Sequence, residues 1–320
     1  MRQPLFSIIM PTYNRACVFC PIINALLAQS ITDFELIIVD DGSTDNTLEI
    51  LSSYDDSRIK VLYQNNNRQT QARRKACNEA KGKYFAFCDS DDIWDVDYLK
   101  SIHLVFAKYN ADFVFTNYIV EGEKRPRIDL NKSETQGWLA NNANLVGKDI
   151  YHFIDLYAAL SYYQPIFCSC QALSCEHYRN IGGISKTLNN LALGTIQTSE
   201  DSHIIRRSAI TQKAYFINQV RVKLGRQGDN MSGSYTSNLH GGLNILLDLY
   251  NNYNLSEPHK LITKKAIRKE RQALSKQIYY FESSANYIKH YRSQPKIDLT
   301  AKNHAHFFYL VAKKFFGLSS

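Results

Sequence analysis

The chain has 320 residues, of which 44% are hydrophobic and 21% charged, a composition typical of globular domains. No apolar run approaches the roughly 18 residues that would cross a membrane, and we expect neither a membrane span nor a signal peptide. The net charge of +8 is uneven, because residues 258–320 hold 13 Lys and Arg against 3 Asp and Glu. This distribution predicts a near-neutral body with a cationic C-terminal part, and it argues against a nucleic-acid binder.

The first 120 residues alternate apolar strands with helices. We expect strands at 6–14, from 34, at 58–64, at 83–92 and at 111–120, and helices at 16–29, 70–80 and 97–108. Ser43 or Thr44 is the expected N-cap of the helix after the second strand, Gly82 is expected to end the helix at 70–80, and Asp95 to cap the helix at 97–108. Such alternation is typical of a parallel α/β sheet.

The pattern changes after residue 120. Residues 120–144 are polar with weak periodicity, which indicates a loop or a weak pair of strands. Residues 180–207 run from a glycine turn through an acid pair into a helix, and residues 225–235 are rich in glycine. Helices are expected at 240–253 and 258–292. We therefore divide the chain into a domain at 1–235 and a basic, mainly helical extension at 236–320.

The seven cysteines form no regular framework, which predicts reduced and mostly buried thiols in a cytoplasmic protein. Two alternatives are a redox pair in "CVFC" (17–20) and a metal cluster in "CSCQALSCEH" (168–177). Neither has a second pair at the spacing of a zinc site, so we discount both.

Three expected strands end in polar or acidic turns, "PTYN", "DDGSTD" and "CDSDD". Ligands of open α/β sheets lie at the carboxyl ends of the strands, so neighbouring strands would bring these turns to one crevice. In "DSDD" (89–92), the D-x-D carboxylates suit Mg²⁺ or Mn²⁺, which take few protein carboxylates and fill their remaining positions with phosphate and water. A solvated turn is the alternative. In "DDGSTD", Asp41 either receives a hydrogen bond from a ligand or belongs to an ordinary turn around Gly42.

Three segments carry a family resemblance: "SIIMPTYNR", "FELIIVDDGSTDNT" and "QARRKACNEAKGKYFAFCDSDDIW". In order, spacing and wording they resemble family 2 inverting glycosyltransferases of the GT-A fold, closely over about residues 5–120 and loosely to about 232. The resemblance implies a mostly parallel central sheet flanked by helices, followed here by the helical extension. It implies transfer of a sugar from a nucleotide diphosphosugar, with a UDP-sugar expected, to a hydroxyl of a glycan or lipid-linked saccharide, as in bacterial surface polysaccharide synthesis.

The resemblance also assigns site residues. Thr12 and Tyr13 would lie against the nucleobase and ribose, Asp41 would bind the base, and Arg73 would face the nucleotide. Asp201 matches the catalytic base, and Arg226 matches an arginine that approaches the diphosphate, followed by Asn230 and Ser232. Mn²⁺ or Mg²⁺ would be held by Asp91 and Asp92. The full donor-binding set is Pro11, Thr12, Tyr13, Arg15, Asp41, Arg73, Asp89, Ser90, Asp91, Glu200 and Arg226.

The sequence departs from the family at three positions. Arg74 and Ala76 replace the usual Asn and Gly, and Gly228 replaces a His that often approaches metal or phosphate. This loss leaves the third metal ligand open. His203 and His240 are candidates, although an ordinary core or surface histidine is the simpler reading of each.

The chemistry of the transfer agrees with these roles. The leaving diphosphate gains charge, which a metal and an arginine such as Arg226 can stabilise. The acceptor hydroxyl must lose a proton to a carboxylate on the opposite side. Glu200 and Asp201 are the other strong acidic candidates of the body, and their alternative role is to cap the helix that follows.

The last segment, "FFYLVAKKFFGL" (307–318), combines aromatic side chains with lysines, which suits an anionic membrane surface. This would place the protein at the inner face of the plasma membrane. The alternative is a set of helices that pack on the body. Two other functions stay open: a sugar nucleotidyltransferase, which lacks its glycine-rich, lysine-bearing loop here, and an inactive nucleotide-sugar-binding scaffold. A dehydrogenase is excluded by the lack of G-x-G-x-x-G.

Overall fold

The computed structural model describes residues 2–66, 68–185, 200–226, 235–281, 308, 309 and 312. These residues belong to two units, one formed by 1–184 with 200–230 and the other by 185–199 with 231–320. The side chains of residues 200, 235–238 and 275–281 are not described. Each unit is treated by itself below.

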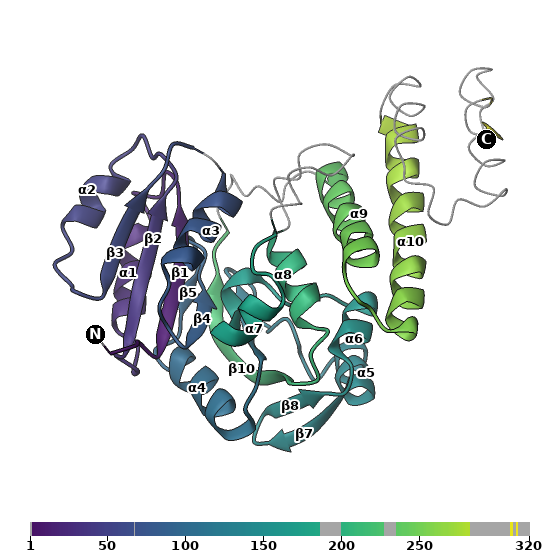
Figure 1. Ribbon diagram of the computed structural model, residues 1–320, viewed down its shortest axis with the longest axis horizontal. Coiled ribbons are helices and arrows are strands. Elements are labelled where there is room, and N and C mark those ends of the chain that lie inside the picture. The colour runs from purple at the N-terminus through teal and green to yellow at the C-terminus, as the bar shows by residue number, and fades with distance from the viewer. Residues whose placement is uncertain are drawn as a thin grey trace. The chain divides into compact units, whose positions relative to one another are not determined.

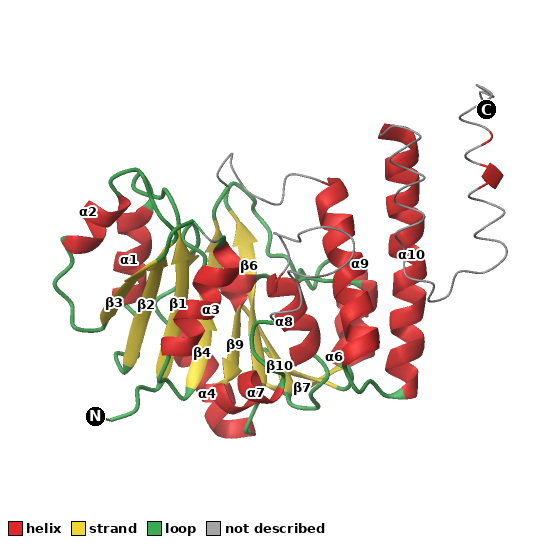
Figure 2. Ribbon diagram, turned by 45° about the horizontal axis from the view of Figure 1, so that its top comes forward, coloured by secondary structure: helices red, strands yellow, loops and turns green. Residues whose placement is uncertain are grey.

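In the described part of the first unit, ten strands form one mixed sheet in the order β3-β2-β1-β4-β9-β6-β10-β8-β7, with β5 beside β10 (Figures 1 and 2). The strands are β1 (Phe6–Thr12), β2 (Phe34–Asp40), β3 (Ile59–Tyr63), β4 (Tyr84–Phe87), β5 (Ile93–Trp94), β6 (Phe113–Val120), β7 (Ala143–Gly147), β8 (Ile150–Phe153), β9 (Gln171–Ser174) and β10 (Ala214–Leu224). The strands β3, β2, β1 and β4 are mutually parallel, as are β6 and β10, whereas β9 lies antiparallel between β4 and β6.

The helices follow the strands in the expected alternation. They are α1 (Phe19–Leu27), α2 (Thr47–Ser52), α3 (Gln69–Glu79), α4 (Tyr98–Tyr109), α5 (Ser133–Asn142), α6 (Leu156–Tyr162), α7 (Cys175–Asn180) and α8 (Glu200–Ser208), with a short 3-10 helix η1 (Cys168–Cys170). Apolar side chains of α1 and α4 form one continuous core with alternate residues of β1, β2, β4 and β6. The other side of β1 and β2 is covered by α3 (Figure 2). The expected α/β fold with a mostly parallel central sheet is confirmed.

One helix forms where we expected a loop or a weak strand pair. Residues 133–142 are α5, and the β7–β8 hairpin begins only at Ala143, at the end of the range in which a strand pair was expected. The helix has few apolar residues and a glycine within it, so its sequence shows no helical period. Tertiary packing holds it instead. The Trp138 ring lies 5.3 Å from that of Phe153, and its Nε1 donates to the carbonyl of Ala159 at 3.1 Å.

The caps expected for α2 and α3 are wrong. The helix α2 begins at Thr47, because Ser43 uses both its N–H and its hydroxyl to bind the side chain of Asp40. The helix α3 ends at Glu79, followed by an extended Ala80. Gly82 has another role: a Cβ there would lie 2.4 Å from the backbone nitrogen of Ser7, so glycine allows the chain to enter β4 close beside β1.

The described part of the second unit is a pair of helices, α9 (Tyr235–Asn252) and α10 (Glu257–Phe281), which pack on each other. They confirm the expected helical extension as far as residue 281. Ile267 and Leu274 of α10 are fully buried. Among the described residues, no helix has the length and apolar character needed to cross a membrane. The proposed membrane segment at 307–318 lies outside the described residues, apart from 308, 309 and 312.

Candidate donor site

The ends of β1 and β2 are locked together. The N–H of Asp41 donates to the carbonyl of Thr12 at 2.9 Å. Asn14, which has a positive φ of 50°, receives the N–H of Thr44 on its side chain at 2.8 Å and gives its own N–H to the hydroxyl of Ser43 at 2.9 Å. Because each loop supplies the other's partners, the two strand ends form one rigid edge of the expected crevice.

This edge carries the predicted base-binding residues. Asp41 is almost fully buried, and one of its oxygens accepts the side-chain N–H of Gln64 at 2.7 Å. Pro11 and Thr12 are buried, whereas Tyr13 is 41% exposed. Among the described residues, the Thr12 hydroxyl has no hydrogen-bond partner although it is buried. A ligand that reached it would satisfy a group whose burial otherwise destabilises the fold.

The D-x-D turn follows β4, directly beside β1 in the sheet. Its first carboxylate, Asp89, lies 2.5 Å from a guanidinium nitrogen of Arg73, a fully buried residue of α3. Gln69 donates to the same oxygen at 3.3 Å. The structure thus brings together two residues that the resemblance assigned separately to the nucleotide site, and Arg73 orients Asp89.

Asp92 faces inward. Its Oδ2 accepts the Ser169 hydroxyl at 2.5 Å, and its Oδ1 accepts the N–H of Gly225 at 3.0 Å. Burial raises the pKa of Asp92 well above its usual range, with further increases from Asp89 and Asp91. Since both oxygens have internal partners and the residue is buried, the geometry argues against the expected role of Asp92 as a direct metal ligand. It acts instead as a strut of the turn.

Asp91 differs from its neighbours. It pairs with Arg15, whose Nη2 lies 3.7 Å from Asp91 Oδ2, and its side chain keeps 16% exposure. Burial raises the pKa of Asp91, as does the charge of Asp89, while Arg15 opposes this effect. Burial and a neighbouring like charge both destabilise the ionised form of a carboxylate, and a bound cation stabilises that form. Asp91 is therefore the acid of the turn that would suit Mn²⁺ or Mg²⁺. The neighbouring Ser90, also expected at the donor site, is buried.

No three His, Cys, Asp or Glu side chains come together as a ready metal site within the described residues. His203 is fully buried in α8. Gly228, Asn230 and Ser232 lie outside the described residues. A cation held at Asp91 would thus take most of its ligands from donor phosphates and water, as Mg²⁺ does where protein ligands are few.

The end of β10 closes this side of the turn. A Cβ on Gly225 would lie 2.2 Å from the carbonyl oxygen of Asp91, so only glycine permits this approach. The next residue, Arg226, is exposed and its guanidinium binds Glu123 at 2.5 Å. The structure therefore places Arg226 next to the D-x-D turn, with its head engaged by a carboxylate that a diphosphate would have to replace.

The proposed base lies in the first turn of α8. The Asp201 carboxylate accepts the N–H of Ser202 at 2.7 Å, while the Glu200 side chain is not described. The helix is anchored by Arg207, which is buried and donates to the carbonyl of Ile181 at 2.7 Å and to that of Gly183. The "IGGI" turn is thus the support on which α8 and its acids are held.

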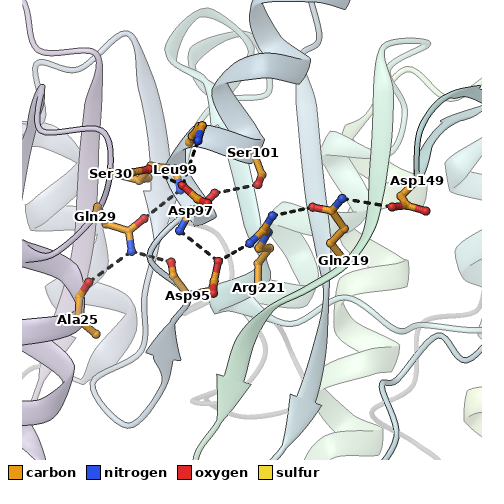
Figure 3. A network of polar contacts seen from close by, with 11 residues as sticks. Ala25, Gln29, Ser30, Asp95, Asp97, Leu99, Ser101, Asp149, Gln219 and Arg221 are labelled. Atoms are coloured by element: carbon orange, nitrogen blue, oxygen red, sulfur yellow. Dashed lines mark hydrogen bonds and ion pairs between the residues drawn. The ribbon is translucent and has the colours of Figure 1, made fainter.

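A polar network fixes the exit of the D-x-D turn (Figure 3). Gln29, which follows α1, donates to the carbonyl of Asp95 at 2.8 Å, and Asp95 binds Arg221 of β10 through its carboxylate. Arg221 donates to Gln219 at 2.8 Å, which in turn donates to Asp149 at 3.2 Å. Asp95 also accepts the N–H of Asp97 at 3.1 Å, but Asp97 is the N-cap residue of α4, so the expected capping of this helix by Asp95 is wrong.

Three residues that hold the site were missed from the sequence. The Ser169 hydroxyl donates to the Asp92 carboxylate and accepts the N–H of Asp89, the latter at 2.9 Å. The N–H of Gly225 donates to Asp92, and the side-chain amide of Gln64 donates to Asp41. Ser169 lies 80 residues beyond Asp89, in a "CSC" segment whose cysteines drew attention to metal binding, so nothing local marked its hydroxyl.

Comparison with known proteins agrees with this geometry. The model of the family described as glycosyl transferase family 2 matches residues 7–166. TuaG of Bacillus subtilis, named for teichuronic acid biosynthesis, is 38% identical over 130 residues, which are 40% of this chain and 52% of TuaG. The Escherichia coli UDP-Glc:α-D-GlcNAc-diphosphoundecaprenol β-1,3-glucosyltransferase WfgD is 38% identical over 119 residues, 37% of this chain and 47% of WfgD. The chain thus spans about half the length of these relatives.

Solved structures share the fold. Residues 1–349 of TarS from S. aureus superpose with a TM-score of 0.65 at 17% identity, covering 98% of this chain and 92% of that one. The same protein with UDP-GlcNAc gives 0.60 at 19% identity, covering 95% and 79%. At such identities the likeness concerns the fold alone. The match of the family model over half of the chain, on the segments that build the site, shows that this protein belongs to glycosyl transferase family 2.

Proposed function

We propose that this chain transfers a sugar from a UDP-sugar to a hydroxyl of a saccharide or lipid-linked saccharide, with inversion at the anomeric carbon. The observation that carries the proposal is the convergence of β1, β2 and β4, which brings Thr12, Asp41 and the acidic turn to one edge of the sheet. The relatives support the donor and acceptor classes: WfgD is named for UDP-Glc and a diphosphoundecaprenol-linked GlcNAc, and TarS was solved with UDP and UDP-GlcNAc.

The roles at the donor follow from the contacts. Asp41 and the exposed Tyr13 are suited to the uracil and ribose. Arg73 holds the Asp89 carboxylate, which would face the ribose. Asp91 and Arg15 lie where the diphosphate would come. A bound Mn²⁺ or Mg²⁺ supplies positive charge to the leaving diphosphate. Arg226 contributes further charge once it leaves Glu123.

Asp201 is the proposed base. As the acceptor oxygen bonds to the anomeric carbon, the bond from that carbon to the diphosphate oxygen breaks, and the hydroxyl proton passes to the Asp201 carboxylate. A single displacement of this kind inverts the anomeric centre. The anchoring of α8 through Arg207 supports this role, since a base must be held in place.

The test combines binding with turnover. Thermal unfolding is measured with UDP-, GDP- and dTDP-sugars, with and without Mn²⁺, and nucleotide release is then measured with saccharide acceptors. We expect stabilisation by UDP-sugars that needs Mn²⁺ and is lost in Asp91→Asn. We expect Asp201→Asn to keep this stabilisation and to lower turnover by roughly 10²–10⁴-fold. Near-normal turnover of Asp201→Asn would exclude it as the base, and binding without release by the wild type would indicate an inactive scaffold.

We also propose that the protein works in the cytoplasm at the inner face of the plasma membrane, where a lipid-linked acceptor would be reached. The basic C-terminal part supports this, because cations are attracted to anionic lipid surfaces. Flotation with anionic liposomes, for the full chain and for a chain without residues 300–320, tests it. Equal flotation of both would show that the aromatic tail is not the membrane contact.

A further inference from the structure

An aromatic side chain lies exposed at the rim of the acidic turn. Phe167 is 46% exposed. It is held by Tyr118 of β6, whose ring centroid lies 5.3 Å away at an interplanar angle of 71°. Tyr118 itself is buried. Phe167 thus has one buried aromatic neighbour and a free surface toward solvent, a firm support for a ligand.

The position of Phe167 is tied to the site. It directly precedes η1, and its carbonyl accepts the N–H of Cys170 at 3.1 Å. Ser169, two residues on, binds both Asp92 and the N–H of Asp89. Two residues span at most about 7 Å of chain, so the backbone of Phe167 lies close to the residue that holds the proposed donor turn.

Polar groups lie near Tyr118, on which this ring packs. The Arg127 guanidinium lies 5.2 Å from the ring centroid of Tyr163, and the Tyr163 hydroxyl donates to the Arg127 carbonyl at 3.2 Å. The N–H of Arg127 in turn donates to the carbonyl of Tyr118 at 2.9 Å. Glu123, which follows β6, binds Arg226 through its carboxylate.

We propose that the exposed ring of Phe167 is an acceptor platform, on which a sugar ring of the acceptor stacks while its hydroxyls bind the neighbouring polar groups Arg127 and Glu123. The proposal rests on the function proposed above and names the site of its second substrate. The C–H face of a pyranose is apolar and its edge is polar, so it needs an aromatic surface bordered by hydrogen-bonding groups. Ligand sites commonly combine aromatic walls with a few polar groups. The platform has both, next to the proposed donor site.

The experiment measures saturation-transfer NMR signals from methyl β-glycosides of glucose, galactose and N-acetylglucosamine, with UDP and the diamagnetic Mg²⁺ present. We expect ring-proton signals from at least one glycoside, a roughly tenfold weaker affinity in Phe167→Ala, and near-normal affinity in Phe167→Trp, because an exposed ring can be replaced by another ring. The UDP signals should stay the same in all three proteins.

Leu104→Ala is the matched control, since Leu104 is an exposed apolar residue of α4 at 59% exposure and lies outside the platform. It should leave the glycoside signals unchanged. Thermal unfolding checks that each variant is folded. The platform is overturned if no glycoside gives a signal while UDP does, or if Phe167→Ala binds like the wild type. If UDP itself gives no signal with the wild type, the proposed donor site fails first, and the platform fails with it.

Discussion

The backbone N–H of Gly225 donates to Asp92 Oδ1 at 3.0 Å, and this contact joins the end of β10 to the turn that follows β4. The two residues are 133 positions apart in the chain. Because the other carboxylate oxygen of Asp92 accepts the Ser169 hydroxyl, the side chain is held in the protein interior. Asp92 thereby fixes the turn that also carries Asp91, whose side chain keeps 16% exposure.

Replacement of Gly225 tests whether this approach is required. In Gly225→Ala the new methyl would lie 2.2 Å from the Asp91 carbonyl oxygen, so β10 and the turn must separate. We expect the free energy of unfolding to fall by roughly 1–3 kcal/mol, as in other overpacked sites, with a large loss of UDP affinity. Urea unfolding and UDP titration measure both.

Gly137→Ala provides the control for that change. Gly137 lies within α5 with open space around its Cβ position, so alanine should leave stability equal or raise it by up to about 1 kcal/mol. UDP affinity should not change. If Gly225→Ala behaved like Gly137→Ala, the close contact with Asp91 would have no role in the donor site.

Ser169→Ala tests the strut beneath the acidic turn. The change removes the hydroxyl that donates to Asp92 and accepts the N–H of Asp89, so two polar groups lose a partner, one of them a buried carboxyl. We expect a loss of roughly 1–3 kcal/mol in the free energy of unfolding and weaker UDP binding. Ser208→Ala is the control: Ser208 is equally buried, but its hydroxyl has no partner among the described residues, so its loss should be neutral. Equal effects of the two variants would contradict the role of Ser169.

Much of the first half of the fold could be predicted from local pattern. The runs around Ile8, Ile37 and Phe85 are apolar throughout, which indicates strands buried on both faces, and their polar ends place the site at one edge. The structure confirms that β2, β1 and β4 are neighbours. The acidic turn was therefore readable as part of a site before its surroundings were known.

The division of labour within the turn could not be predicted. Asp89, Asp91 and Asp92 are alike in sequence, and they differ only through partners that lie far along the chain: Arg73, Arg15, and Ser169 with Gly225. The strand β9 follows η1 directly and lies antiparallel between β4 and β6. It is only four residues long and has no distinct sequence pattern. Sequence spacing contains no record of such long-range pairs.

The ion pair between Asp95 and Arg221 is expected to add little to stability. Asp95 is 40% exposed and Arg221 21%, so water screens their attraction. A double-mutant cycle with Asp95→Asn and Arg221→Gln, followed by urea unfolding, should give a coupling of about 1 kcal/mol or less that shrinks in high salt. A coupling well above this value would mean that the whole network of Figure 3, including Gln219 and Asp149, acts as one unit.

The thiols offer a test of burial and of redox state together. All seven cysteines are free, and Cys17 and Cys20 are exposed while the other five are buried. Burial raises the pKa of Cys77 to about 12, and it also raises the pKa values of Cys88, Cys170 and Cys175. Since the thiolate is the reactive form, titration with Ellman's reagent at pH 8 should find two fast thiols in the native protein and seven after unfolding in guanidinium.

The same shift gives a sign for alkaline stability. An unfolded cysteine ionises near pH 8.5, whereas native Cys77 stays protonated until pH approaches 12. Its burial therefore contributes stability that is fully present below about pH 8.5 and is lost as pH rises toward 12. Cys77→Ala should flatten this alkaline decline in urea-unfolding midpoints, although the cavity it leaves lowers stability at every pH. If only five thiols titrate after unfolding without reductant, two cysteines have formed a disulfide. That result would favour the alternative in which Cys17 and Cys20 are a redox pair.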